Sequence, residues 1–445
     1  MSGSFTGAAT DAETTGVEEA LDAARSRYVD GRPRGHELDR AAREVMPGGN
    51  TRTVLYHPPF PLRVARAHDA VLEDVDGRQY VDLLGNYSAG LYGHSDPVIK
   101  AALEKAVRNG VGPGAHTPHE IAMARAVCDR FDSIERARFT NSGTEANLMA
   151  LSAARAFTGR ERILAFRGGY HGGLLTFAHG PEPVNAPYEV VLAPYNDVET
   201  ATRLLEQYAD SVAAVLVEPM LGSGGCIPGE PAFLRALADA TRETGALLVL
   251  DEVMTSRTGR GGMQPRIGVT ADLTTLGKYL GGGFSIGAFG GRADVMALFD
   301  PSQPGALPHA GTFNNNLASM TAGHAGLTQV YTPDVAERHT ERGEALRTEL
   351  AALLRDTDSR FGVTGVGTLM NLHATTSPVT RPEDLADADG RLKELLFLDL
   401  LEAGYYVAAR GYLALSLAVT DDQIRGFLTA LRAALTARPG LFTRP

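Results

Sequence analysis

The spacing of hydrophobic and polar positions changes along the N-terminal part of the chain. Apolar side chains recur at helical spacing over residues 17–46, with an interruption near Gly31, which predicts helical structure on both sides of a break. The pattern then switches to alternation in three segments, 62–67, 70–75 and 79–83. The dipeptide Asp76-Gly77 between the last two predicts a hairpin, because both residue types tolerate the backbone of a tight turn.

Between residues 136 and 298 the pattern becomes a repeat of short apolar runs and helical segments. The runs lie at 163–166, 190–192, 212–217, 246–250 and 286–289, and the main helical patterns at 144–157, 198–208 and 231–244. Uninterrupted apolar strands separated by helices predict an α/β body with a parallel sheet that is covered on both faces. In such a sheet, function concentrates at the carboxyl ends of the strands.

The C-terminal part predicts a smaller α+β lobe that packs against the N-terminal hairpins. Its expected elements are a helix from 333 to about 356, a strand at 363–373, a helix at 383–402, strands at 406–407 and 413–417, and a helix from 420. We therefore expect a disordered lead-in at 1–16, the N-terminal part of a small domain at 17–95, a large domain at 96–330, and the C-terminal part of the small domain at 331–445.

Composition narrows the class of protein. With 445 residues, 44% of them hydrophobic and 21% charged, the chain can bury a sizeable core. A net charge of −11 argues against nucleic acid or an anionic membrane as the main partner. Cys128 and Cys226 lack metal-ligand spacing, so we expect no metal site, and two cysteines are too few for a disulfide framework, so we expect a reducing compartment. No apolar run is long enough for a membrane span and the N-terminus lacks signal-peptide features, so a cytoplasmic enzyme is expected.

Two residues after strand patterns are candidates for chemistry. Lys278 has apolar neighbours and is followed by three glycines, and desolvation would lower the pKa of its amine, as Schiff-base formation requires. On this segment alone, a solvated lysine at a helix end is the stronger interpretation. Asp251 ends the run 246–250 and could hold a protonated pyridine nitrogen, a metal or a ribose, or could cap a turn.

Two further segments have the composition of a ligand cradle. Ser142-Gly143-Thr144 follows a short strand and opens a helix, where hydroxyls and free N–H groups would bind a phosphate; an ordinary capped helix is the alternative. The segment lacks the lysine and glycine spacing of a P-loop, which argues against a nucleotide site. Tyr170 and His171 lie between glycine pairs, so the tyrosine could stack on a planar ligand, or the segment could be a plain glycine-rich loop.

A phosphate cradle, a stacking aromatic, a strand-end aspartate and a lysine about 27 residues after it are the parts of a pyridoxal-phosphate site. From about Met46 to the last helix, the sequence resembles the class III aminotransferases of fold type I, which include ω-aminotransferases and glutamate-1-semialdehyde aminomutases. The segments that carry the resemblance are NSGTEAN, GGYHGG, VEPM, LVLDEVMT, DLTTLGKYLGGG and HAGTFNNN.

The resemblance implies a cofactor, a fold and a set of site residues. The cofactor is pyridoxal 5'-phosphate, and the fold has a mostly parallel seven-stranded sheet with a small domain built from both chain ends. Lys278 forms the Schiff base and Asp251 pairs with the pyridine nitrogen, while Thr312 reaches the phosphate of the neighbouring subunit in a homodimer. The full implied set of cofactor contacts is Ser142, Gly143, Thr144, Tyr170, His171, Glu218, Asp251, Val253, Lys278 and Thr312.

Two positions depart from the family pattern. Leu221 stands where class III enzymes often have glutamine, which puts a polar contact from that position in doubt. After Gly311-Thr312, the aminomutases typically have a serine-glycine-asparagine run, whereas this chain has Phe-Asn-Asn-Asn at 313–316, which disfavours an aminomutase.

Within the class, the sequence is most similar to aminotransferases of aromatic β-amino acids such as β-phenylalanine. Residues 48–57, 314–316 and 409–411 carry this similarity. It implies amino transfer from a β-amino acid to a keto acid such as 2-oxoglutarate by a ping-pong mechanism, with Arg52, Arg410 and Tyr87 at the substrate. Arginine suits that task because its planar fork binds a carboxylate through two hydrogen bonds.

Three alternatives remain open at the level of sequence. One is an aminomutase or an α-decarboxylase with the same cofactor site, and another is an aminotransferase of ω-amines or α-amino acids. The third is a cofactor-binding regulator or scaffold, against which the intact Lys278 and Asp251 argue, since a scaffold needs neither. A visible absorption band that bleaches with an amino donor and returns with a keto acid would distinguish an aminotransferase from a mutase or a scaffold.

Overall fold

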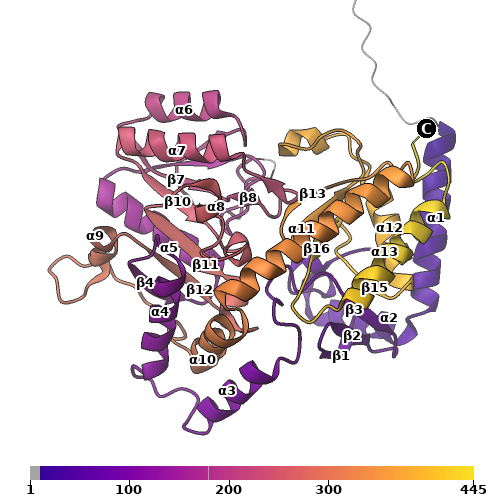
Figure 1. The fold of residues 1–445 in the computed structure, drawn as a ribbon, viewed down its shortest axis with the longest axis horizontal. Helices are drawn as coiled ribbons and strands as arrows, with labels where there is room; N and C mark the ends of the chain where they lie inside the picture. The colour runs from indigo at the N-terminus through magenta and orange to yellow at the C-terminus, as the bar shows by residue number, and fades with distance from the viewer. Residues whose placement is uncertain (1–10, 179, 445) are drawn as a thin grey trace, which may run out of the picture.

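The structure is a computed structural model that describes residues 11–178 and 180–444. It has a large body around one wide sheet and a smaller body to which both chain ends contribute (Figure 1). The helix α11 (Pro333–Asp356) runs from the large body into the small one.

The large sheet has seven strands among the described residues, and the predicted mostly parallel arrangement is confirmed. Its strands, in spatial order, are β4 (Arg136–Thr140), β12 (Gly287–Gly291), β11 (Leu273–Gly277), β10 (Leu247–Asp251), β7 (Val212–Val217), β5 (Arg162–Phe166) and β6 (Val190–Ala193). All neighbours from β11 to β6 pair parallel, whereas β12 runs antiparallel to both of its neighbours.

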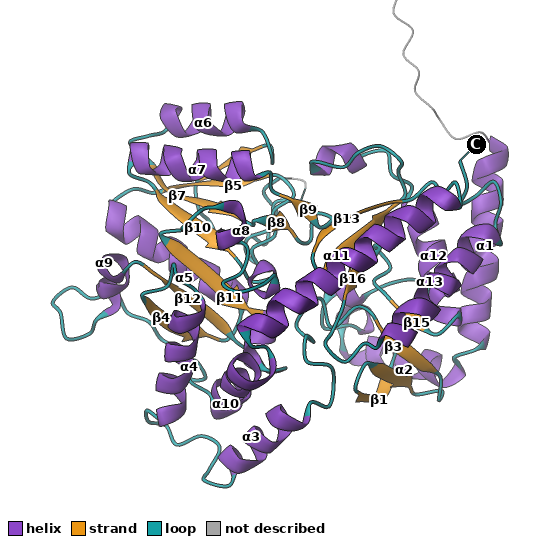
Figure 2. Ribbon diagram, in the orientation of Figure 1, coloured by secondary structure: helices purple, strands orange, loops and turns teal. Residues whose placement is uncertain are grey.

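The central strands are buried on both faces, as their uninterrupted apolar sequence predicts. In β7, Val215 and Val217 pack into one hydrophobic cluster while Ala214 and Leu216 pack into another, on the opposite face. The helices of the large body are α3 (Pro97–Val107), α4 (Pro118–Arg130), α5 (Gly143–Thr158), α6 (Val198–Gln207), α7 (Pro231–Thr244), α8 (Gln264–Ile267), α9 (Ala293–Met296) and α10 (Leu317–Ala325). They lie around the sheet, except α3, which packs against α10 away from it (Figure 2).

In the small body, strands from distant parts of the sequence share a sheet. The β2–β3 hairpin predicted around Asp76-Gly77 forms, and β15 then pairs parallel with β3. The chain ends are therefore joined by backbone hydrogen bonds as well as by packing. The sheets are β1 (Val64–His68), β2 (Val71–Asp74), β3 (Gln79–Asp82) with β15 (Tyr405–Tyr406); β13 (Gly362–Val366), β14 (Leu369–His373) with β16 (Tyr412–Ala414); and, between the bodies, β8 (Met220–Leu221) with β9 (Ile227–Pro228).

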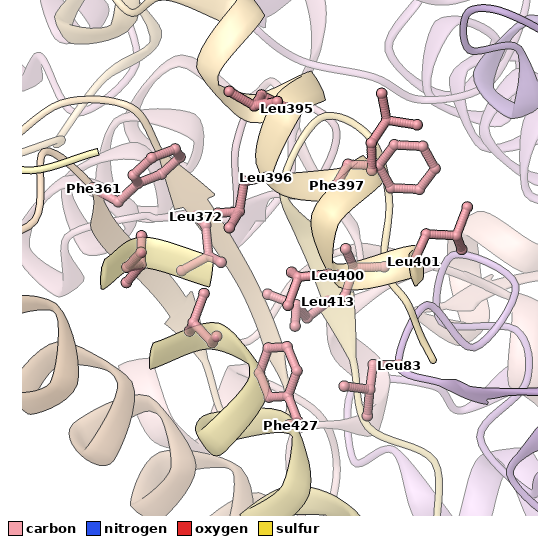
Figure 3. Packing of buried hydrophobic residues seen from close by; sticks show 14 of the residues in the cluster. Leu83, Phe361, Leu372, Leu395, Leu396, Phe397, Leu400, Leu401, Leu413 and Phe427 are labelled. Carbon is pink, nitrogen blue, oxygen red and sulfur yellow. The ribbon is translucent and has the colours of Figure 1, made fainter. Parts of the chain in front are cut away.

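One hydrophobic cluster forms the core of the small body (Figure 3). It joins residues from the N-terminal helix, such as Leu21, to residues of the C-terminal elements, such as Leu400 and Phe427, all of which are at most 1% exposed. The helices that contribute are α1 (Asp11–Asp30), α2 (Pro33–Val45), α12 (Gly390–Glu402) and α13 (Asp421–Thr436). Both chain ends are thus needed for one core.

Three expectations about element boundaries are wrong. Residues 11–16 of the predicted lead-in are helical, because α1 is held by Val17 and Leu21 in the core and each further helical residue adds a backbone hydrogen bond; residues 1–10 lie outside the described residues. The predicted strand 363–373 is a hairpin that turns at Gly367, whose φ of 56° suits glycine. The helix predicted from 383 begins at Gly390, after a short 3₁₀ turn.

None of the helices in the described ranges combines the length and the apolar character needed to cross a bilayer.

We expect Leu400→Ala in α12 to lower the free energy of unfolding by about 2–5 kcal/mol, because it leaves a cavity in the core shared by both chain ends. Urea denaturation followed by circular dichroism measures the change. Leu38→Ala is the matched control, since Leu38 is 41% exposed and should shift stability by less than about 0.5 kcal/mol. Equal effects from the two variants would contradict the shared core.

Candidate active site

Four sequence segments with candidate chemistry meet at one edge of the large sheet. The strands β11, β10, β7 and β5 are consecutive neighbours and run parallel, so their carboxyl ends lie side by side. Lys278 follows β11, Asp251 ends β10, Glu218 follows β7, and the glycine-rich loop with Tyr170 follows β5. Segments separated by more than a hundred residues are therefore brought together by the sheet order alone.

Asp251 is a buried carboxylate, 4% exposed, with three hydrogen-bond donors. Its Oδ2 atom lies 2.8 Å from Nδ1 of His171 and accepts a hydrogen bond from Nδ2 of Asn147, also at 2.8 Å. Its Oδ1 atom accepts one hydrogen bond, from the backbone N–H of Val253 at 3.0 Å. Oδ1 therefore keeps acceptor capacity for a ligand.

Asn147 is a site residue that sequence reasoning quoted within a motif but gave no role. It is 1% exposed, and its Nδ2 also donates to the backbone carbonyl of His171 at 3.1 Å. Its Oδ1 accepts a hydrogen bond from the Thr275 hydroxyl at 2.7 Å. Asn147 lies one helical turn after Gly143 on α5 and so shares a helix face with the cradle, which is the sequence feature that could have indicated it.

Lys278 is held in an unusual backbone conformation next to this carboxylate. Its φ is 54°, in the left-handed region that a side chain other than glycine rarely adopts, which fits a functional position. Desolvation lowers the pKa of its amine to about 8, although the charges of Asp251 and Glu218 oppose that shift. Roughly a tenth of the amine is thus neutral at pH 7, far more than for a lysine of ordinary pKa.

Glu218 is 5% exposed and lies against the glycine-rich loop. It accepts backbone hydrogen bonds from Tyr170 and Gly222, both at 2.9 Å. Burial raises its pKa to about 7; His171 opposes this rise and the charge of Asp251 adds to it. Glu218 therefore fixes the loop that carries Tyr170.

The segment at the start of α5 forms an open cradle. Ser142 is the N-cap and accepts from Glu145 N–H at 3.2 Å, while the N–H groups of Gly143 and Thr144 have no acceptor within the described residues. A Cβ atom at Gly143 would lie 2.9 Å from a methyl of Val253, so the two segments need glycine to approach this closely. Free N–H groups at a helix N-terminus suit an anion.

Of the two residues between the glycine pairs, His171 faces inward and Tyr170 outward. His171 is 2% exposed and Tyr170 is 44% exposed. An outward ring beside the cradle is available for stacking on a ligand, whereas the imidazole is engaged with Asp251.

The three predicted substrate residues come together around one short segment. The guanidinium of Arg410 lies 5.0 Å from the centroid of the Tyr87 ring and donates to the Ser223 hydroxyl at 3.0 Å. Arg52 is exposed and donates to the Asn86 side chain at 2.9 Å. Two arginines from opposite ends of the chain thus lie next to Asn86 and Tyr87.

Thr312 is the cofactor contact that was predicted to act on the neighbouring subunit. It is exposed, and its side chain forms no hydrogen bond within the described residues. Two of the asparagines that follow it are structural, because Asn314 accepts from Asn141 at 3.0 Å and Asn316 caps α10. Leu221, 1% exposed, packs in the apolar cluster beside β7, so hydrocarbon occupies the position of the usual glutamine.

The sequence matches the family model of class III aminotransferases over residues 54–435. Together with the fold, this shows that the chain belongs to the class III aminotransferases, the fold type I enzymes that use pyridoxal 5'-phosphate.

Several relatives span nearly the whole chain. The β-phenylalanine transaminase of Variovorax paradoxus is 49% identical over 96% of this chain and 98% of its own, and its crystal structure superposes with a TM-score of 0.95, covering 96% and 99% of the two chains. A glutamate-1-semialdehyde 2,1-aminomutase of Sorangium cellulosum is 37% identical over 90% of this chain and 95% of its own. A transaminase solved with pyridoxal phosphate bound is 34% identical, covers 91% of this chain and 97% of its own, and superposes with a TM-score of 0.84.

The residues at the sheet edge fit this cofactor. They provide a buried carboxylate with free acceptor capacity for a protonated pyridine nitrogen, an amine of lowered pKa and an N–H cradle for a phosphate. Across 11–178 and 180–444, no group of three or more His, Cys, Asp or Glu side chains is arranged to hold a metal ion.

We expect Asn147→Ala to weaken cofactor retention about 10- to 100-fold, because it removes a hydrogen bond to the buried charge of Asp251. Equilibrium dialysis against pyridoxal phosphate, read by absorbance, measures the effect. Thr275→Val should produce a smaller change of the same sign. Ser152→Ala, on the same helix and bonded only to Leu148, is the control; an equal effect there would show that α5 is merely destabilised.

Proposed function

We propose that this aminotransferase moves the amino group of an aromatic β-amino acid, such as β-phenylalanine, to a keto acid such as 2-oxoglutarate in two ping-pong half-reactions. The observation that carries the proposal is the placement of Arg52 and Arg410 beside Asn86 and Tyr87. The named activity of the Variovorax relative supports it.

Carboxylate geometry explains why two arginines suit this pair of substrates. The reacting amine of a β-amino acid is one carbon farther from the carboxylate than that of an α-amino acid. One site must therefore hold carboxylates at different distances from Lys278. We assign the carboxylate of the amino donor to Arg52, on the exposed loop. We assign the carboxylate of the keto acid to Arg410, whose guanidinium lies over the Tyr87 ring.

The same proposal assigns the residues around the cofactor, which supplies an electron sink when bound. The amine of Lys278 would hold the cofactor covalently and would then accept and return the proton that the substrate carbon loses. Asp251 keeps the ring nitrogen protonated. The cradle Ser142, Gly143 and Thr144 holds the phosphate, Tyr170 and Val253 cover the two ring faces, and His171 and Glu218 hold Asp251 and the loop in place.

We also propose a cytoplasmic homodimer in which Thr312 completes the partner's phosphate site. Thr312 is exposed in one chain, and the neighbouring Phe313 is 66% exposed. An exposed aromatic side chain of this size favours burial against a second subunit. Asn314 ties this segment to the residue that precedes the cradle. Both cysteines are free, as a reducing compartment favours.

An aminomutase is the second candidate, and the 37% identity to the Sorangium enzyme is the observation that favours it. Supplying glutamate-1-semialdehyde as the only substrate separates the two. A mutase isomerises it without a keto acid, whereas the proposed enzyme needs an acceptor for turnover.

Lys278→Ala should abolish the visible absorbance of lysine-bound cofactor and nearly all turnover. The sequence has only four lysines, and the others are Lys100, Lys105 and Lys393. Borohydride reduction followed by peptide mapping tests the assignment, and cofactor fixed to another lysine of the variant would refute it. Because the neutral amine is the nucleophile, cofactor loading of the wild-type apoenzyme should accelerate as pH rises through about 8 and then level off.

Arg52→Ala should reduce kcat/KM for β-phenylalanine by about one to two decades, since a charge-assisted pair contributes about 1.5–3 kcal/mol. Turnover of 1-phenylethylamine, which has no carboxylate, should be unchanged or faster. Steady-state kinetics with both donors measures this, with the exposed Arg40→Ala in α2 as control. Equal losses with both donors would mean that Arg52 has a structural role.

A further inference from the structure

A cavity of about 670 Å³ lies between the two bodies, beside the loop that carries Tyr170. Its volume is within the usual range for small-molecule sites. One wall comes from the large body, from the segments that follow β5 and β8. The other comes from the small body, from β14, residues 382–386, the first turn of α12 and Arg410. Arg410 thus belongs to both the cavity and the proposed substrate site, and Tyr170 belongs to both the cavity and the proposed cofactor site.

The cavity contains positive charge without a matching carboxylate. Lys393 and Arg410 are half-buried and Arg167 is exposed, and none of them forms an ion pair within the described part of the chain. Glu383 also lines the cavity, but it is exposed and pairs with none of these cations. Arg410 and Lys393 therefore repel each other, and an anion bound between them would relieve that repulsion.

Lys393 is at a position that disfavours a cation. It lies in the first turn of α12, at the positive end of the helix dipole. Burial lowers the pKa of its amine, and the charge of Arg410 lowers it further. A lysine with no carboxylate partner at such a position destabilises the folded chain unless an anion binds there.

Buried polar atoms without partners line the same cavity. Asn371 is 3% exposed and His373 is 1% exposed, yet Oδ1 of the first and Nδ1 of the second have no hydrogen-bond partner within the described residues, nor has Nε of Arg410. The other ring nitrogen of His373 is engaged, 3.0 Å from the Gly225 carbonyl. Unsatisfied buried polar groups are costly, and a polar ligand with its water would satisfy them.

We propose that this cavity binds the distal carboxylate of a dicarboxylic keto acid, the one farther from the keto group. Lys393 and Arg410 are the cationic partners of that carboxylate. The proposal rests on the proposed function, because it extends the acceptor site from Arg410 to Lys393. It predicts selection of dicarboxylic over monocarboxylic keto acids. Arg167, exposed at the rim, attracts the anion but contributes less.

The second half-reaction tests this, with enzyme first aminated by β-phenylalanine and then mixed with either 2-oxoglutarate or pyruvate. Lys393→Met should lower kcat/KM for 2-oxoglutarate about 10- to 100-fold and change that for pyruvate less than about threefold, because pyruvate has no second carboxylate. Lys393→Arg should restore most of the loss. Lys105→Met, an exposed change on α3, is the control.

Binding of glutarate, which has two carboxylates and no keto group, gives a readout that does not depend on turnover. Calorimetric titration of the holoenzyme should show at least tenfold weaker glutarate binding in Lys393→Met. Equal losses with both acceptors, or unchanged glutarate binding, would overturn the proposal while the proposed function stands. If the aminated wild-type enzyme reacts with neither acceptor, the proposed function is overturned and this proposal with it.

Discussion

The buried carboxylate of Asp251 is the group on which the rest of the site depends. A charge removed from water is costly unless it is paired and hydrogen-bonded. Here His171 and Asn147 satisfy one oxygen, and the backbone of Val253 donates to the other. These partners come from the loop after β5, from α5 and from the end of β10, so the carboxylate is satisfied only when all three segments are in place. Fold and site are therefore held by the same contacts.

Burial shifts the pKa values of two groups beside Asp251 in opposite directions. Burial raises the pKa of Glu218 to about 7, and the charge of Asp251 adds to that rise. Burial lowers the pKa of Lys278 to about 8, although both carboxylates oppose the shift. As pH rises past these values, Glu218 becomes charged and Lys278 loses its charge, so the neutral amine is most abundant when Glu218 is ionised.

Much of the fold and most of the site can be predicted from the sequence because their determinants are local. The run 212–217 is apolar at every position and forms the buried strand β7. The strand β11 was not predicted, because Thr274 and Thr275 interrupt its apolar pattern; both are fully buried, and Thr275 bonds to Asn147. The role of Asn147 depends on Asp251, 104 residues away. The charged cavity requires the packing of the two bodies, which no local pattern describes.

We expect Asp251, held by its buried partners, to keep the ring nitrogen of the bound cofactor protonated. Nuclear magnetic resonance of the enzyme reconstituted with cofactor labelled with nitrogen-15 in the ring reports that protonation directly. The account predicts a protonated nitrogen in the wild-type enzyme across the neutral pH range and its loss in Asp251→Asn. An unprotonated nitrogen in the wild-type enzyme, or a protonated one in the variant, would contradict it.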